Sequence, residues 1–293
     1  MQKYAIICKK KRENNRNTKV DKGKLRMKTI LSINHKFFEI SPKEFIDIVV
    51  KNDKQNLIRG FEAVTKSKDE EEYLKKFAKI ASDNGYIVNL HAPSLCNVEQ
   101  YESYLDFAVE ISKIQRRKVN IVFHPINADS LEESKKVTNC YVTELTEYIA
   151  ENKYNEYIEL SLENLNDFEK IKRLKKENLI DILNENQDIK FTYDIGHEMM
   201  DDMIKKDKLN EILAERLNNV HIHTKGELED HYPIIEKTEK HTKQVLEKTK
   251  QLIESGYNGD IVMEYAIDYI DGKNLKEKLI CYINCAKIIL TSV

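Results

Sequence analysis

Six segments of the chain have the pattern of a short β-strand that ends on a metal-binding type of side chain. In each, an apolar or β-branched run stops at His, Asp or Glu, and a helix-like stretch follows. The residues at these ends are His91, His124, Glu163, Asp194, His221 and Glu264. Parallel strands carry their carboxyl ends to one edge of a sheet, so residues far apart in the sequence meet there. We therefore expect these six side chains to share a site.

Strand and helix patterns alternate from Met27 onward. Strand-like runs lie near residues 29–34, 57–64, 86–91, 119–124, 157–163, 188–194, 218–222 and 260–264. Amphipathic stretches between or after them lie near residues 69–82, 98–113, 130–151, 167–183, 198–216, 234–254 and 275–290. This alternation favours an α/β fold, a single (β/α)8 TIM barrel of parallel strands with a metal site at its C-terminal rim. An open doubly wound sheet is disfavoured, because no glycine-rich phosphate loop follows any strand and the chain has only 8 glycines.

Residues 1–26 are unlike the rest of the chain, because charged side chains and asparagines dominate them. A disordered basic arm and an artefact of the start site or vector are the favoured interpretations, and a nucleic-acid-binding tail is a third. We expect residues 27–293 to form the barrel domain.

Composition excludes several classes of function. Lys and Arg total 48, and Asp and Glu total 50. The resulting net charge of -2 does not attract the chain to nucleic acid or to an anionic membrane. No apolar run approaches the length that spans a bilayer. The 5 cysteines are odd in number and include no CxxC pair, which indicates neither a disulfide framework nor a thiolate zinc site. We expect a cytoplasmic protein without membrane contact.

Short motifs beyond the strands carry the chemistry. In Asp194-Ile-Gly-His197 a carboxylate precedes an imidazole by one turn, and we interpret the glycine as allowing a tight turn toward one ion. Glu163 and Glu264 end the fifth and eighth strands, so they would face each other across the mouth of a barrel. Two such carboxylates can clamp a metal and move protons on either side of a substrate.

Further histidines also lie at or just beyond the ends of predicted strands. In His221-Ile-His223 we expect the two rings to point to opposite faces of a strand, so that one of them reaches the metal. The next loop supplies Glu229-Asp230-His231, and either acid could be the ligand. A single histidine at a strand end is more often a hydrogen-bonded rim residue than a ligand. Here 7 of the 8 histidines lie at or just beyond predicted strand ends, which favours a metal site.

Two further residues approach the predicted rim. His35 follows the first strand and Glu62 lies within the second. For both, a role at the site, in support of its ligands or in contact with substrate, and a structural role are equal alternatives.

The ordered set of motifs resembles the xylose isomerase-like TIM-barrel superfamily over residues 29–290. The motifs are His91-Ala-Pro, His124-Pro, Glu163-Asn, Asp194-x-x-His197, His221-x-His223, Asp230-His231 and Glu264. In its single-metal epimerase branch, the resemblance implies metal ligation by Glu163, Asp194, His221 and Glu264. It also implies that His197 contacts the substrate and that the two glutamates exchange a proton with the carbon next to a carbonyl.

The endonuclease IV branch of the same superfamily would use more ligands. The resemblance then adds His91, His124, His197, His231 and an acid two residues before the last, for three zinc ions that activate water against a phosphodiester. That acid is Glu229 here, where the family has aspartate, and the family's glycine-rich continuation is missing after it.

Charge favours the first branch. Acidic runs such as Asp69-Glu-Glu-Glu72 and Glu198-Met-Met-Asp-Asp202 follow the predicted strands, and they would repel a DNA duplex. We therefore expect a sugar or sugar-phosphate isomerase or epimerase that uses Zn²⁺ or Mn²⁺. A multi-zinc phosphodiesterase acting on abasic DNA, the one case with a nucleic-acid partner, is the first alternative. A barrel that binds a metal or a sugar without catalysis is the second.

Overall fold

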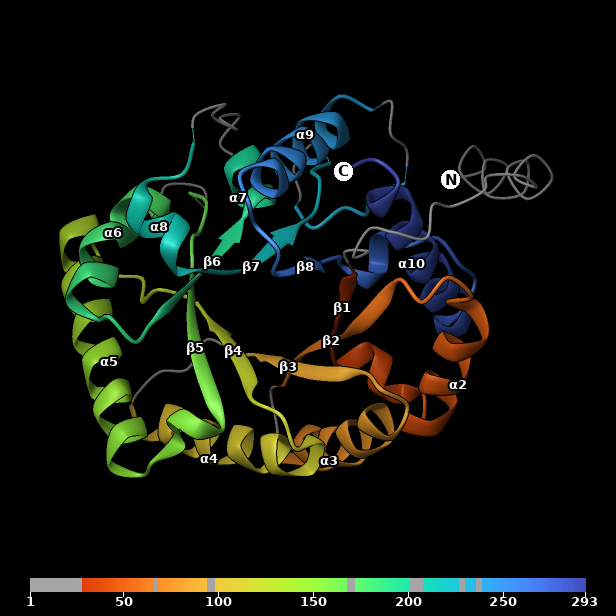
Figure 1. Ribbon diagram of the computed structural model, residues 1–293, viewed down its shortest axis with the longest axis horizontal. Coiled ribbons are helices and arrows are strands. Elements are labelled where there is room, and N and C mark those ends of the chain that lie inside the picture. The colour runs from red at the N-terminus through yellow and green to blue at the C-terminus, as the bar shows by residue number, and fades with distance from the viewer. Residues whose placement is uncertain are drawn as a thin grey trace.

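The chain forms a closed barrel of parallel strands (Figure 1). A computed structural model describes residues 28–65, 68–93, 98–167, 172–200, 208–226, 230–235 and 239–293. Each strand pairs with the next along the chain, and β8 pairs with β1. The strands are β1 (Thr29–Ile33), β2 (Ile58–Val64), β3 (Ile87–His91), β4 (Val119–Phe123), β5 (Ile158–Glu163), β6 (Lys190–Asp194), β7 (Leu217–Ile222) and β8 (Asp260–Met263). The predicted (β/α)8 barrel is confirmed, and every predicted strand lies within two residues of an observed one.

Helices surround the strands in the described part of the chain (Figure 1). They are α2 (Pro42–Asn52), α3 (Lys68–Asp83), α4 (Val98–Gln115), α5 (Leu131–Glu151), α6 (Lys176–Glu185), α7 (Ile195–Met200), α8 (Glu211–Arg216), α9 (Lys240–Glu254) and α10 (Leu275–Leu290). Short 3-10 helices are η1 (His35–Glu39), η2 (Tyr154–Glu156) and η3 (Ile267–Tyr269). The periodicity did not single out α2, which begins at a Ser41 cap whose side chain accepts from the Glu44 N–H.

Two helices begin later than their patterns predict. Of the stretch predicted to be helical over 167–183, the described residues are helical only from Lys176, where α6 begins, and the Asp167 carboxylate accepts the backbone N–H of Arg173 ahead of it. The stretch predicted over 234–254 becomes α9 only at Lys240, where Glu239 caps the first turn by accepting backbone N–H groups. Of the stretch predicted over 198–216, the described residues form α7 and α8.

The main apolar core lies between the strands and the helices, whereas the inside of the barrel is largely polar. Ile30, Ile87 and Val262 form a small separate apolar cluster. Nearer the carboxyl ends, buried polar side chains occupy the register positions of neighbouring strands: Ser32, Glu62, Asn89, Thr192 and Asn219. Branched apolar residues usually fill this space in such barrels. A polar layer therefore lies directly beneath the strand ends.

No helix among the described residues is long and apolar enough to cross a membrane. The predictions for residues 1–26 lie outside the described residues.

Candidate metal centre

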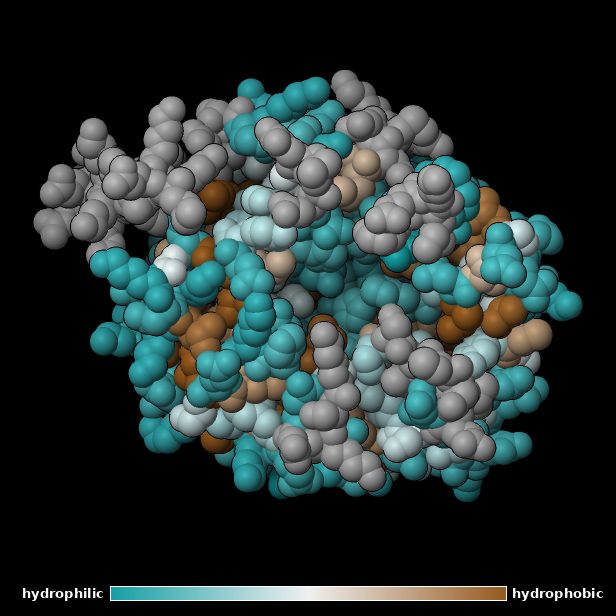
Figure 2. Space-filling model, turned by 180° about the vertical axis from the view of Figure 1, so that it is seen from behind, coloured by the Kyte–Doolittle hydropathy of each residue, from teal (hydrophilic) through white to brown (hydrophobic). Residues whose placement is uncertain are grey.

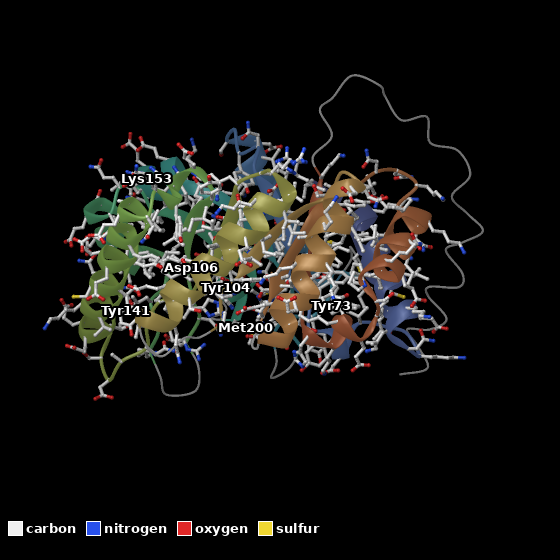
Figure 3. The ribbon with its side chains drawn as sticks, turned by 90° about the horizontal axis from the view of Figure 1, so that it is seen from below. Tyr73, Tyr104, Asp106, Tyr141, Lys153 and Met200 are labelled. Carbon is white, nitrogen blue, oxygen red and sulfur yellow. The ribbon has the colours of Figure 1, made fainter. Side chains whose placement is uncertain are left out.

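Eight side chains at the C-terminal end of the barrel form two groups of four, and within each group the donor atoms all lie within 4.8 Å of one another. The first group is His91, Glu163, His221 and Glu264, and the second is Asp194, His197, His223 and His231. Figure 3 labels one residue toward each end of the barrel. Lys153 precedes β5 and marks the N-terminal end, and Met200 ends α7 and marks the C-terminal end. On the face seen in Figure 2, hydrophilic residues gather in a central hollow.

In the first group, two carboxylates flank two imidazoles. His221 Nδ1 lies 2.8 Å from Glu264 Oε2 and 3.5 Å from Glu163 Oε1. His91 Nε2 lies 3.2 Å from Glu163 Oε2 and 3.8 Å from Glu264 Oε1. Each glutamate therefore faces the same pair of ring nitrogens.

The second group is built around Asp194. Its Oδ1 lies 3.3 Å from His223 Nε2 and its Oδ2 lies 3.5 Å from His197 Nδ1. The His223 and His231 rings stack with centroids 4.3 Å apart. The backbone of His231 is left-handed, with φ of 58°, and its N–H donates to His223 Nδ1. This unusual conformation brings the loop histidine over the barrel mouth.

The two groups touch each other. Glu163 Oε1 lies 3.5 Å from His197 Nδ1, and Glu264 Oε1 lies 3.7 Å from His231 Nε2. His124 adds a further contact, since its Nε2 lies 3.3 Å from Glu163 Oε2. The six strand-end residues that we expected to share a site are therefore in one connected cluster.

Asn164 holds the ends of β5 and β6 together. Its side-chain amide accepts the N–H of Asp194 and donates to the carbonyl of the same residue, both at 2.9 Å. Its own carbonyl accepts from His197 Nδ1 at 2.8 Å. One buried amide thus sets the spacing of Glu163, Asp194 and His197.

Gly196 has a different function from the one that we inferred. It is not among the residues with positive φ, so the turn does not require glycine. A Cβ at this position would lie 2.3 Å from the His223 ring. Glycine is needed because the imidazole packs directly on the backbone of α7.

Burial and charge perturb the ionisable groups of the first group. Burial alone would raise the pKa of Glu163 and of Glu264, but the facing imidazoles outweigh it and hold both well below the usual range. Burial likewise opposes protonation of His221, yet Glu62, Glu163 and Glu264 raise its pKa well above normal. The pKa of His91 is raised to about 9 by the same carboxylates against the effect of burial. Without a metal, imidazolium groups therefore neutralise the acids.

The donor set fits a divalent metal. Glu163 Oε1, Asp194 Oδ2 and His223 Nε2 are buried and have no hydrogen-bond partner. Leaving such atoms unpaired is costly, and a metal ion would satisfy them. Imidazole and carboxylate ligands suit Zn²⁺ and Mn²⁺.

The other candidate residues have varied positions. His35 is exposed in η1, whereas Glu62 is fully buried, with Oε1 3.1 Å from His221 Nε2. Asp230 lies behind His231, whose Nδ1 it contacts at 2.7 Å. Glu229 lies outside the described residues.

His223 is the site residue that the motif analysis missed. We expected the two rings of this pair to point to opposite faces, and that expectation was wrong, because residues two apart on a strand point to the same face. Both rings are completely buried, one in each group. The available signal was the spacing, since two histidines that are two residues apart point to the same face of a strand.

One cavity lies elsewhere. Its lining includes Arg59, Asn120 and Asp260, at the N-terminal ends of the strands. It is therefore at the opposite end of the barrel from the two groups.

Comparison with known proteins shows the fold. No family model and no curated protein matches the sequence. A xylose isomerase domain-containing protein from Salmonella typhimurium LT2 is similar in structure, with a TM-score of 0.64 and 14% identity over 92% of this chain and 100% of that one. A D-tagatose 3-epimerase-like protein has a TM-score of 0.58 and 19% identity, covering 89% and 99%. SacUVDE has a TM-score of 0.56 and 12% identity, covering 91% and 100%.

Proposed function

We propose that this barrel, which has the fold of the xylose isomerase-like superfamily, is a divalent-metal-dependent isomerase or epimerase of a sugar or sugar phosphate. The arrangement of Glu163 and Glu264 around His221 carries the proposal. Two carboxylates at one metal position provide proton acceptors on two sides of a bound substrate. The D-tagatose 3-epimerase-like neighbour supports this choice of reaction.

The residues of the first group would hold the metal, which would be Zn²⁺ or Mn²⁺. His91 belongs to this group, whereas Asp194, which the sequence analysis gave as a ligand of the same ion, lies in the second group. Once bound, the ion would polarise the carbonyl or hydroxyl oxygens of the substrate. In the metal-free protein the facing imidazoles hold the pKa of both glutamates low, so both carboxylates are ionised and available to the ion. One would accept a proton from the carbon next to the carbonyl, and the other would return a proton to the product. His197, at the edge of the first group, would donate to a substrate oxygen.

Charge at the described part of the rim supports a small substrate. Lys36 forms an ion pair with Asp268 at 2.5 Å, and Lys176 pairs with Glu198. Both lysines are therefore already neutralised by acids. A protein that holds a DNA duplex needs cations that are available to its phosphates.

A second candidate function is a multi-zinc phosphodiesterase of the endonuclease IV type. The observation that favours it is the second group, which places Asp194, His197, His223 and His231 beside the first. The contact of His124 with Glu163 extends the set of ligands further. The structural similarity to SacUVDE is compatible with this alternative.

Deuterium exchange tests the primary proposal without knowledge of the natural sugar. The protein, loaded with Mn²⁺ or Zn²⁺, is incubated in D₂O with a panel of ketoses and ketose phosphates, and NMR follows deuterium at the carbon next to the carbonyl. We expect exchange that Glu163→Gln and Glu264→Gln abolish and that Glu72→Gln, an exposed control on α3, leaves unchanged. Loss of exchange in Glu264→Gln with metal still bound would exclude a non-catalytic barrel.

Cleavage of abasic-site DNA at low salt tests the alternative. We expect no nicking by the metal-loaded protein. Nicking that His124→Ala removes would refute the isomerase proposal and support the phosphodiesterase.

A further inference from the structure

The cavity at the N-terminal end of the barrel is lined by charged and amide side chains. It has a volume of about 160 Å³, which is room for a small ion or several waters. Asn89 and Asn219 in its wall are buried, whereas Arg59 and Arg117 are exposed. The cavity is therefore open to solvent on its charged side, and it extends to amide groups inside the barrel.

The charged side chains of the lining carry one positive charge more than they balance among themselves. They are the cations Arg59, Arg117 and Lys118 and the acids Glu159 and Asp260. Arg59 pairs with Asp260 at 2.6 Å, and Lys118 lies 4.0 Å from Glu159, at the limit of an ion pair. Arg117 forms no ion pair with any residue that the structure describes. Burial raises the pKa of Asp260 while Arg59 and Arg117 oppose that rise, so Arg117 lies near this carboxylate without pairing with it.

One buried amide in the wall has an unused donor. Asn120 lies on β4 and Asn218 on β7, and Asn218 Nδ2 donates to Asn120 Oδ1 at 2.8 Å across the barrel. This bond fixes which end of the Asn120 amide carries the oxygen. Asn120 Nδ2 is buried and has no hydrogen-bond partner among the described residues. An unpaired buried donor is costly, so the wall is arranged for an acceptor that comes from outside the chain.

Neighbouring asparagines of the wall are already engaged with the barrel. Asn89 Oδ1 accepts the backbone N–H of Asn120 at 3.2 Å, and Asn219 Nδ2 donates to Glu62 Oε2 at 3.2 Å. A water molecule could accept from Asn120 Nδ2, but it would not balance the charge of Arg117. A ligand that completes the cavity must therefore bring acceptor oxygens together with negative charge.

We propose that this cavity binds a small phosphate-bearing anion whose oxygens accept from Asn120 Nδ2, Arg117 and Lys118. A phosphate group offers three acceptor oxygens and carries about 1.5 to 2 negative charges at neutral pH. A guanidinium group matches this geometry with two parallel N–H donors, and a lysine adds a point charge. The site is separate from the metal centre, because it lies at the opposite end of the barrel.

The position of the cations in the chain supplies a matched control. Arg116, Arg117 and Lys118 all follow the last residue of α4, and cations are generally favourable at the C-terminus of a helix. Only the second and third of them line the cavity. Arg116 is exposed as Arg117 is. Replacing either arginine by glutamine therefore changes the net charge equally, but only Arg117→Gln changes the cavity.

Titration of the full chain with inorganic phosphate at low salt tests the proposal. We expect a saturable shift of the Asn120 side-chain amide in ¹⁵N NMR, with that resonance identified by its loss in Asn120→Asp. Calorimetry should show affinity that falls about 10-fold in Arg117→Gln and stays at the wild-type value in Arg116→Gln. Asn120→Asp keeps the acceptor for Asn218 but presents an oxygen in place of the free donor, so it should abolish binding. Acetate, with one charge and two oxygens, should bind at least about 10-fold more weakly than phosphate.

Several results would overturn the inference. They are the absence of a saturable shift of the Asn120 amide, an equal loss of affinity in Arg116→Gln and Arg117→Gln, and acetate that binds as tightly as phosphate. If Asn120→Asp does not fold, the comparison of the two arginine variants decides. Affinity should be the same with and without bound Zn²⁺. Phosphate that binds only with Zn²⁺ and is insensitive to Arg117→Gln would lie at the metal centre, which would refute this inference and leave the proposed function intact.

Discussion

Substitution of Gly196 by alanine tests the packing that forms the second group. The new Cβ would lie 2.3 Å from the His223 ring, about 1 Å closer than an ordinary contact allows. Overpacking of this kind costs about 1–3 kcal/mol. Alanine also favours a helix over glycine by about 1 kcal/mol. We therefore expect Gly196→Ala to destabilise the protein by about 0–2 kcal/mol.

The sign should reverse when the ring is removed. In a His223→Ala background nothing opposes the Cβ, so the same substitution should stabilise by up to about 1 kcal/mol. Urea unfolding of the wild type, both single variants and the double variant gives the four free energies. We expect a coupling energy of about 1–3 kcal/mol between the two positions. Additive effects would refute the explanation that Gly196 exists to accommodate His223.

Two further predictions concern protons and a buried ion pair. The pKa of His91 is raised to about 9 in the folded protein, and the pKa values of His221 and His231 are raised well above normal. The stability that these protonated histidines contribute is complete below about pH 6.5 and is lost as the pH rises through about 9. The urea midpoint of the metal-free protein should therefore fall over that range while its Zn²⁺ affinity rises, because binding releases these protons; a midpoint that rises would contradict the assignment. Lys176 pairs with Glu198 next to His197, and both side chains are largely buried. Lys176→Met should therefore cost about 3 kcal/mol in urea unfolding, because it removes the cation from the Glu198 carboxylate, which keeps the Tyr193 hydroxyl as a donor. The double variant with Glu198→Met should recover part of that loss, and a neutral single variant would show that the pair is not buried in solution.

The strand ends could be predicted because their pattern is local. An apolar run that stops at Glu163 or Asp194 is visible in a few residues, and parallel topology then places every such end at one rim. The fold and the cluster of strand-end residues follow from that rule alone.

Contacts between strands could not be predicted in the same way. Glu62 and His221 meet across the barrel, and no local pattern links β2 with β7. Nor does spacing reveal that the His223 ring packs on Gly196, since that contact joins the end of β7 to a different element, α7.

The number of divalent ions bound per chain tests the central claim most directly. Native mass spectrometry of the protein, dialysed against limiting Zn²⁺ or Mn²⁺, counts them, and His221→Ala identifies the ion held by the first group. The proposed isomerase predicts one tightly bound ion that this variant loses. No bound ion would contradict the metal centre, and two or three zinc ions would contradict the isomerase in favour of the phosphodiesterase.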